Sequence, residues 1–133
     1  MGYELSIGEA IVKCSYEDGL EGSCHIWTEE AASKFAPEGC QSNRLYKSYS
    51  GYSRFCERTG LDQVLMEPLS RDNEVGIAGG HPGAIPITPE LKELIDICHG
   101  AWTRPFNFPL LEWFKFWVDW SLESCNTPVF CNW

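Results

Sequence analysis

Apolar and polar side chains alternate at the start of the chain as they do in a half-buried β-strand. Residues 3–7 place Tyr, Leu and Ile between Glu and Ser. Gly8-Glu9 predicts a two-residue turn, after which residues 10–16 continue the alternation on a returning strand. The pattern predicts an antiparallel hairpin, and His25-Ile26-Trp27 is expected to add a third short strand.

Helical periodicity dominates the second half of the chain. Thr88-Pro89-Glu90 combines an N-cap residue, a proline suited to the first helical position and a first-turn acid, which predicts a helix over 89–99. A second helix is expected over 109–124, apolar over most of its circumference. Its polar residues form one narrow stripe, made of Glu112, Lys115, Asp119 and Glu123.

Weaker patterns fill the middle of the chain. Ser50 is a suitable N-cap for a helix over 51–59, and Gly60 has the form of a left-handed helix stop. A short helical turn is expected after Thr28, and the glycines and prolines of Arg71–Pro86 predict a loop.

These elements predict an α+β fold in a single domain over 1–133, with an N-terminal hairpin or small sheet covered by about three helices. The chain holds six Trp, five Tyr and seven Phe. A domain of this size can hardly bury all of these rings, so some are expected to line a pocket or a subunit interface. A homo-oligomer, most simply a dimer, is therefore predicted.

Composition excludes several classes of partner. With 10 basic and 19 acidic side chains, the net charge of −9 argues against a nucleic-acid polymer as ligand. The longest apolar-rich stretch, 105–122, is interrupted by polar residues, so no membrane span is expected. Seven Cys without a C-x-x-C spacing, and no secretion signal, predict buried free thiols and a cytoplasmic location, the host cytoplasm if the chain is viral. No metal site and no cofactor are predicted.

Positive charge is concentrated in one segment. Residues 44–58 contain four of the ten basic residues and only one acid, interleaved with Tyr side chains. Arginine pairs with phosphate in a two-pronged geometry, and a Tyr ring can stack on a base. The segment therefore suggests an anion site, and the alternative interpretation is a solvated helix face.

A glycine-rich stretch, residues 76–83, offers backbone N–H donors that can approach an anion closely. It has neither the P-loop nor the dinucleotide-binding spacing, and a plain surface loop is the alternative. His81 within it is a side chain able to titrate near neutral pH.

Two short stretches, Met1–Ala10 and His81–Thr88, resemble parts of small uncharacterised proteins encoded by tailed bacteriophages. The resemblance implies no activity and no site residues. It points to accessory phage functions, among them inhibitors of host defence that bind a protein or sequester a nucleotide signal.

The leading functional hypothesis is a non-enzymatic protein that sequesters a small anionic, nucleotide-like ligand. The residues expected to bind it are Arg44, Tyr46, Lys47, Tyr49, Arg54, His81 and, as an outlying candidate, Arg104. The first alternative is an acidic module that inhibits a host protein, because residues 1–38 carry eight acids against two bases. The second alternative is a small enzyme of unknown reaction, but no catalytic motif is present and no catalytic residue is predicted.

Overall fold

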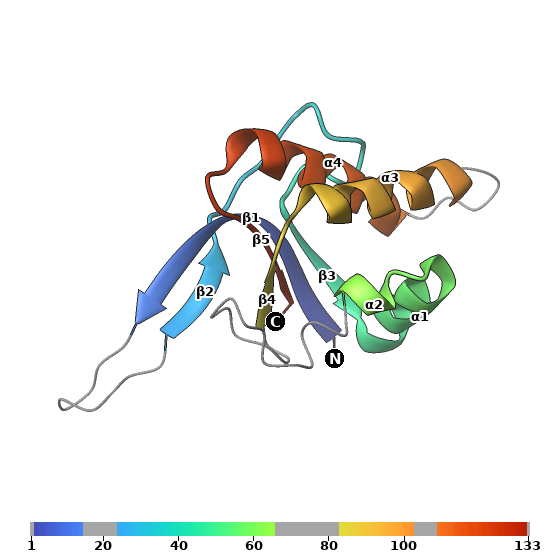
Figure 1. Cartoon of the computed structure of the whole chain (residues 1–133), viewed down its shortest axis with the longest axis horizontal. Coiled ribbons are helices and arrows are strands. Elements are labelled where there is room, and N and C mark those ends of the chain that lie inside the picture. The colour runs from blue at the N-terminus through green and yellow to red at the C-terminus, as the bar shows by residue number, and fades with distance from the viewer. Residues whose placement is uncertain (1, 15–23, 66–82, 103–108, 133) are drawn as a thin grey trace.

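A five-stranded antiparallel sheet with helices packed on it makes up the described part of the chain, in a computed structural model (Figure 1). The structure describes residues 2–14, 24–65, 83–102 and 109–132. Helices α3 (Pro89–Trp102) and α4 (Pro109–Ser124) cross one face of the sheet, while α1 (Tyr49–Thr59) and α2 (Asp62–Leu65) lie at its side. The predicted α+β class is confirmed.

The first strand, β1 (Gly2–Cys14), is long enough to pair with three others. It pairs with β3 (Arg44–Ser48) through its first half and with β2 (Cys24–Thr28) through its second half. Strand β5 (Pro128–Asn132) pairs with the middle of β1, and β4 (Gly83–Pro86) pairs with β5. Strands from the two ends of the sequence are therefore neighbours at the centre of the sheet.

The turn predicted at Gly8-Glu9 is wrong, because β1 runs straight through it. Gly8 lies opposite Val129 in the ladder, and a Cβ at this position would come 3.1 Å from the Asn43 side-chain nitrogen and 3.2 Å from the Glu29 carbonyl. Glycine at this position relieves a close approach of other atoms and does not form a turn. The antiparallel partner of β1 that follows it in the sequence is β2, which contains the predicted third strand, residues 25–27.

The segment between β2 and β3 is irregular, with turns at 34–35 and 38–39, and it contains no helix, so the helical turn predicted after Thr28 is wrong. It crosses over α4, where Trp113 and Trp117 donate their indole N–H groups to the carbonyls of Ser42 and Cys40, at 2.9 and 2.8 Å. An antiparallel bridge pairs Ala32 with Ser42. Tertiary hydrogen bonds override the local helical preference of this segment.

The two long helices follow the sequence pattern closely. Helix α4 has the predicted bounds, and α3 begins as predicted, with the Thr88 hydroxyl accepting the Leu91 N–H at 3.2 Å. Helix α3 continues past the predicted stop at Gly100 to Trp102. The apolar face of α4 lies on the sheet, where Trp113, Phe114 and Trp117 are at most 1% exposed. These rings are buried within a single copy of the chain.

Helix α1 begins two residues earlier than predicted. Its N-cap is Ser48 and not Ser50, and the Ser48 hydroxyl accepts the Gly51 N–H at 3.2 Å. The predicted stop at Gly60 is confirmed, with a left-handed φ of 76°. Both serines are acceptable caps by residue type, and the end of β3 decides between them.

Strands β4 and β5 were not expected from the sequence. Strand β4 lies inside the predicted loop Arg71–Pro86, whose earlier part falls outside the described residues. In β5, Val129, Phe130 and Cys131 are all 0% exposed, because both faces of this central strand are covered. A strand buried on both faces shows no alternation of apolar and polar residues. Among the described residues, no helix has the length and hydropathy of a membrane span.

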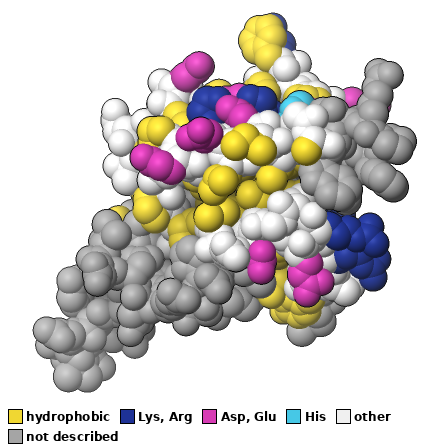
Figure 2. Space-filling view, turned by 45° about the vertical axis from the view of Figure 1, so that its right-hand side comes forward, with side chains coloured by type: hydrophobic (Ala, Val, Ile, Leu, Met, Phe, Trp, Pro, Cys, Tyr) yellow, Lys and Arg dark blue, Asp and Glu magenta, His cyan; other side chains and the backbone are white. Residues whose placement is uncertain are grey.

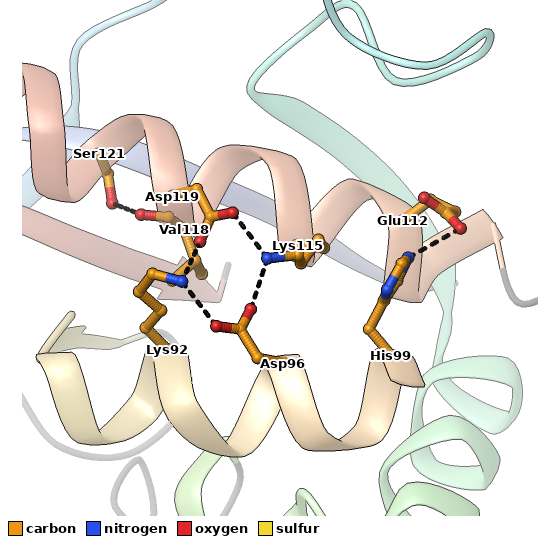
Figure 3. Close-up of polar contacts among 8 residues, drawn as sticks. All are labelled: Lys92, Asp96, His99, Glu112, Lys115, Val118, Asp119 and Ser121. Atoms are coloured by element: carbon orange, nitrogen blue, oxygen red, sulfur yellow. Dashed lines mark hydrogen bonds and ion pairs between the residues drawn. The ribbon is translucent and has the colours of Figure 1, made fainter. Parts of the chain in front are cut away.

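Four alternating charges join α3 to α4, and we call this group the ionic ring (Figure 3). Its members are Lys92, Asp96, Lys115 and Asp119. The Nζ–carboxylate distances around it are 2.6, 2.6, 2.9 and 3.0 Å. Next to it, His99 Nε2 lies 2.9 Å from Glu112 Oε1. The polar stripe predicted on α4 thus faces the polar residues of α3.

The ionic ring should make stability depend on pH in the acid range. Burial acts to raise the pKa of Asp96, but hydrogen bonds from Lys115 and Lys92 outweigh it and hold this pKa below its ordinary value. A carboxyl whose pKa is lowered by folding stabilises the protein above its unfolded-state pKa of about 4 and loses this effect as the pH falls. Asp96→Asn should therefore lower the free energy of unfolding at pH 7, and the difference from the parent should vanish towards pH 2.

Chemical denaturation across this pH range measures the effect. The control is Glu93→Gln, which removes an exposed acid of α3 that makes no ion pair with a described residue. Its difference from the parent should stay small and nearly constant with pH. A constant difference for Asp96→Asn would show that the ring does not hold the Asp96 carboxylate.

Candidate functional site

Three basic side chains surround one pocket at the side of the sheet. Lys47 comes from the end of β3, and Arg54 and Arg58 come from α1. The pocket has a volume of about 260 Å³. Its lining consists of Lys47, Gly51, Arg54, Phe55, Arg58, Pro109 and Leu110. Figure 2 shows a group of Lys and Arg side chains at the side of the molecule where α1 lies, with acidic side chains beside it, and acidic and basic side chains intermingled over α3 and α4. We call this group the basic pocket.

The cations of the basic pocket differ from three other described cations in their surroundings. Arg44 lies 3.7 Å from Glu4, and Lys92 and Lys115 belong to the ionic ring. Lys47, Arg54 and Arg58, like the exposed Lys34, make no ion pair with any described residue. In a chain with 19 acidic side chains, three clustered cations that are not paired with a described acid form a local patch of positive charge.

Local structure explains how the three cations meet. Arg54 and Arg58 are four residues apart and share one face of α1. A Cβ at Gly51 would lie 3.3 Å from Lys47 Cε and 2.8 Å from Ser48 Oγ. The missing side chain therefore lets the Lys47 stem lie across the first turn of α1, towards the arginines.

The floor of the pocket is apolar and closely packed. Phe55 and Leu110 are each 4% exposed, and the Phe55 ring stacks on Phe114 with centroids 5.7 Å apart. Pro109 contributes the first residue of α4 to the wall. A charged rim over an apolar floor is the usual construction of a small-molecule site.

The structure brings together only part of the predicted site. Lys47 and Arg54 both line the basic pocket. Arg44 and Tyr46 alternate with Lys47 along β3, so they lie on the opposite face of the sheet. There, Arg44 contacts Glu4 and donates to the Thr28 carbonyl at 3.3 Å, while Tyr46 is 63% exposed. The basic residues of the 44–58 segment therefore do not form one site, because β3 directs them to two opposite faces of the sheet.

The remaining predicted residues lie elsewhere. The Tyr49 ring packs edge-on against Tyr3 with centroids 4.6 Å apart and does not line the basic pocket. His81 and Arg104 lie outside the described residues. Arg58 lines the pocket but was not among the selected ligand residues, although its spacing of four from Arg54 was visible in the sequence.

A second hollow, of about 330 Å³, is acidic. Its charged lining residues are Glu9, Glu29 and Glu30, with Trp120 and Cys125 beside them. The Glu9 carboxylate already accepts the backbone N–H groups of Asn126 and Thr127, at 3.2 and 2.6 Å. Glu9 thus holds the connection from α4 to β5, and a protein-binding role for the acidic N-terminal region stays a prediction.

Cys40, Cys56, Cys98 and Cys125 are free thiols, as predicted, and Cys131 is buried in β5. Burial is the main cause that raises the pKa of each of Cys40, Cys98 and Cys125, and it raises the pKa of Cys56 to about 12. These thiols are therefore protonated and poorly nucleophilic at neutral pH. Within the described ranges, no three His, Cys, Asp or Glu side chains are arranged to hold a metal ion.

Comparison with known proteins found no matching family, no matching curated protein and no matching solved structure. The resemblance to phage-encoded proteins therefore stays a prediction from two short stretches of sequence.

Proposed function

We propose that the protein binds a small phosphate-bearing, nucleotide-like anion in the basic pocket and does not transform it. The observation that carries the proposal is the set of three cations, Lys47, Arg54 and Arg58, which share one pocket and make no ion pair with a described residue. Clustered like charges repel one another, and a bound anion relieves that repulsion. Arginine also matches the geometry of phosphate oxygens.

The overall charge of −9 is compatible with a compact anion. At physiological ionic strength, exposed charges more than about 8 Å apart are largely screened. A ligand held by three local cations is therefore little affected by distant carboxylates. A long polyanion would instead pass over much of the acidic surface, which disfavours a nucleic-acid polymer.

The lining of the pocket supports binding without turnover. Its described lining residues supply no carboxylate, imidazole, thiol or hydroxyl group that could act as a nucleophile or a general base. The polar side chains among these residues are one ammonium and two guanidinium groups. Such a set neutralises and orients an anion.

The wider role that we propose is the sequestration of a nucleotide signal, and it rests on the resemblance to phage-encoded proteins. A homo-oligomer belongs to the same proposal. The rings of α4 are buried within one copy of the chain, so they do not support an oligomer. Support for it comes from Leu94 and Ile97 of α3, two apolar side chains that are 40% and 61% exposed.

The test is a thermal-shift and calorimetric titration with AMP. A ligand at 100 times its dissociation constant adds about 2.7 kcal/mol to the stability of the folded state, which gives a clear rise in Tm. Arg54→Gln and Arg58→Gln should each weaken AMP binding about tenfold, the loss of one charge-assisted contact. The matched control is Lys34→Gln, an exposed lysine whose Nζ lies 5.5 Å from the centre of the Phe35 ring, and it should leave the affinity unchanged.

Two results would contradict the proposal. One is no binding of AMP at millimolar concentration. The other is an affinity that survives the simultaneous replacement of Lys47, Arg54 and Arg58 by glutamine. Recovery of unaltered AMP after prolonged incubation would separate a binding protein from an enzyme.

A further inference from the structure

The basic pocket carries more positive charge than a singly charged ligand can neutralise. Among the described residues, its lining has three cations and no acidic side chain. On this basis, and resting on the proposed function, we propose that the pocket selects a terminal phosphate group, that is, a phosphomonoester in its dianionic form. Phosphodiesters, including cyclic nucleotides, are disfavoured.

The chemistry of the two ligand classes differs in charge and in free oxygens. A phosphomonoester has a second pKa of about 6, so it is close to a dianion at pH 7.5, and it presents three terminal oxygens. A phosphodiester carries one charge and presents two free oxygens. Two guanidinium forks and one ammonium group supply enough donors to occupy three oxygens, and with a diester some of these donors have no acceptor.

The size of the pocket also favours a terminal group. Its volume of about 260 Å³ lies just below the range of about 300–1,000 Å³ typical of sites that enclose a whole small molecule. The apolar floor of Phe55 and Leu110 accommodates the part of the ligand next to the phosphate. A diester has a carbon substituent on two of its phosphate oxygens, on one linked group in a cyclic nucleotide or on two groups in a linear one, whereas a monoester has a substituent on only one oxygen.

The proposal implies a pH dependence that originates in the ligand. The described charged groups around the pocket are Lys47 from β3, Arg54 and Arg58 from α1, and their exposed neighbour Glu57. Along α4, the first charged side chain after Pro109 and Leu110 is Glu112, whose Oε1 lies 2.9 Å from Nε2 of His99 on α3 (Figure 3). His99 is the described imidazole of this region, so its contribution must be separated from that of the ligand.

Calorimetric titration of the full chain with AMP and with 3′,5′-cyclic AMP, at pH 7.5 and at pH 5.5, tests the inference. At pH 7.5, AMP should bind at least tenfold more tightly than the cyclic diester. The affinity for AMP should fall about fourfold at pH 5.5, following the loss of the dianion, and that for cyclic AMP should stay constant. The variant His99→Gln, which keeps a hydrogen-bond donor but cannot titrate, should show the same fourfold change.

Each contrary outcome has a separate meaning. Equal affinities for AMP and cyclic AMP would overturn the selection for a dianion and leave the proposed function in place. A pH dependence that disappears in His99→Gln would also overturn it, since the titrating group would then be the protein's. No binding of either nucleotide would overturn the inference together with the proposed function.

Discussion

Replacing Trp117 by alanine should lower the free energy of unfolding by about 3–5 kcal/mol, the range measured for large aromatic side chains removed from cores. Trp117 is 0% exposed, and its ring makes edge-to-face contacts with Phe116 and Trp120 at 5.0 and 5.1 Å. Its indole N–H also holds the Cys40 carbonyl at 2.8 Å, and alanine leaves this buried acceptor without its donor.

Urea denaturation of parent and variants measures this effect. Trp117→Phe keeps an aromatic ring but loses the indole N–H, so its cost should be smaller, about 1–3 kcal/mol. The matched control is Phe35→Ala, because Phe35 is 82% exposed and its removal should change stability by no more than about 0.5 kcal/mol. A cost for Trp117→Ala no greater than that of Phe35→Ala would show that Trp117 is not a core residue.

Replacing Asn43 by alanine should have a comparable effect, about 3–5 kcal/mol, for a purely polar reason. Asn43 is 0% exposed, and its side-chain nitrogen donates to the carbonyls of Ile7 and Glu29 at 3.0 and 2.7 Å. Its side-chain oxygen accepts the Ala31 N–H at 3.0 Å. The amide thus satisfies three backbone groups in the gap between β2 and β3, and alanine leaves all three unpaired at a cost of about 1–3 kcal/mol each.

The variant Asn43→Asp tests whether the hydrogen bonds of the Asn43 amide, and not only the shape of its side chain, stabilise the protein. The carboxylate is nearly isosteric with the amide, but it has no donor for the two carbonyls and places a buried charge beside them. We expect it to destabilise the protein at least as much as alanine at neutral pH. Asn126→Ala, a change of an exposed asparagine, is the control and should cost little. A parent-like stability of Asn43→Asp would refute the assigned donor directions.

Helices whose ends are determined by nearby capping residues were predictable from the sequence. Helix α4 has the predicted bounds because its periodicity is long and Pro109 suits its first turn. The N-cap of α3 and the left-handed Gly60 depend only on residues within one turn. The start of α1 was ambiguous because Ser48 and Ser50 are equally good caps, and the pairing of β3 with β1 determined which one is used.

Features that depend on distant partners were not predictable. Gly8 has the local chemistry of a turn, but the approach of Asn43 is the reason for a glycine there. The irregular path before β3 is held by indole groups more than 70 positions away in the chain, namely those of Trp113 and Trp117. Strand β5 has no alternation because it is covered on both faces.

The candidate site shows the same division. The concentration of cations over 44–58 is a property of the sequence alone, and the i, i+4 spacing of Arg54 and Arg58 places them on one helix face wherever α1 lies. Whether Lys47 or Arg44 joins them depends on which face of β3 meets α1, and the pairing of β3 with β1 decides this. The wall formed by Pro109 and Leu110 exists only because α4 packs beside α1, a contact between distant segments that no local pattern encodes.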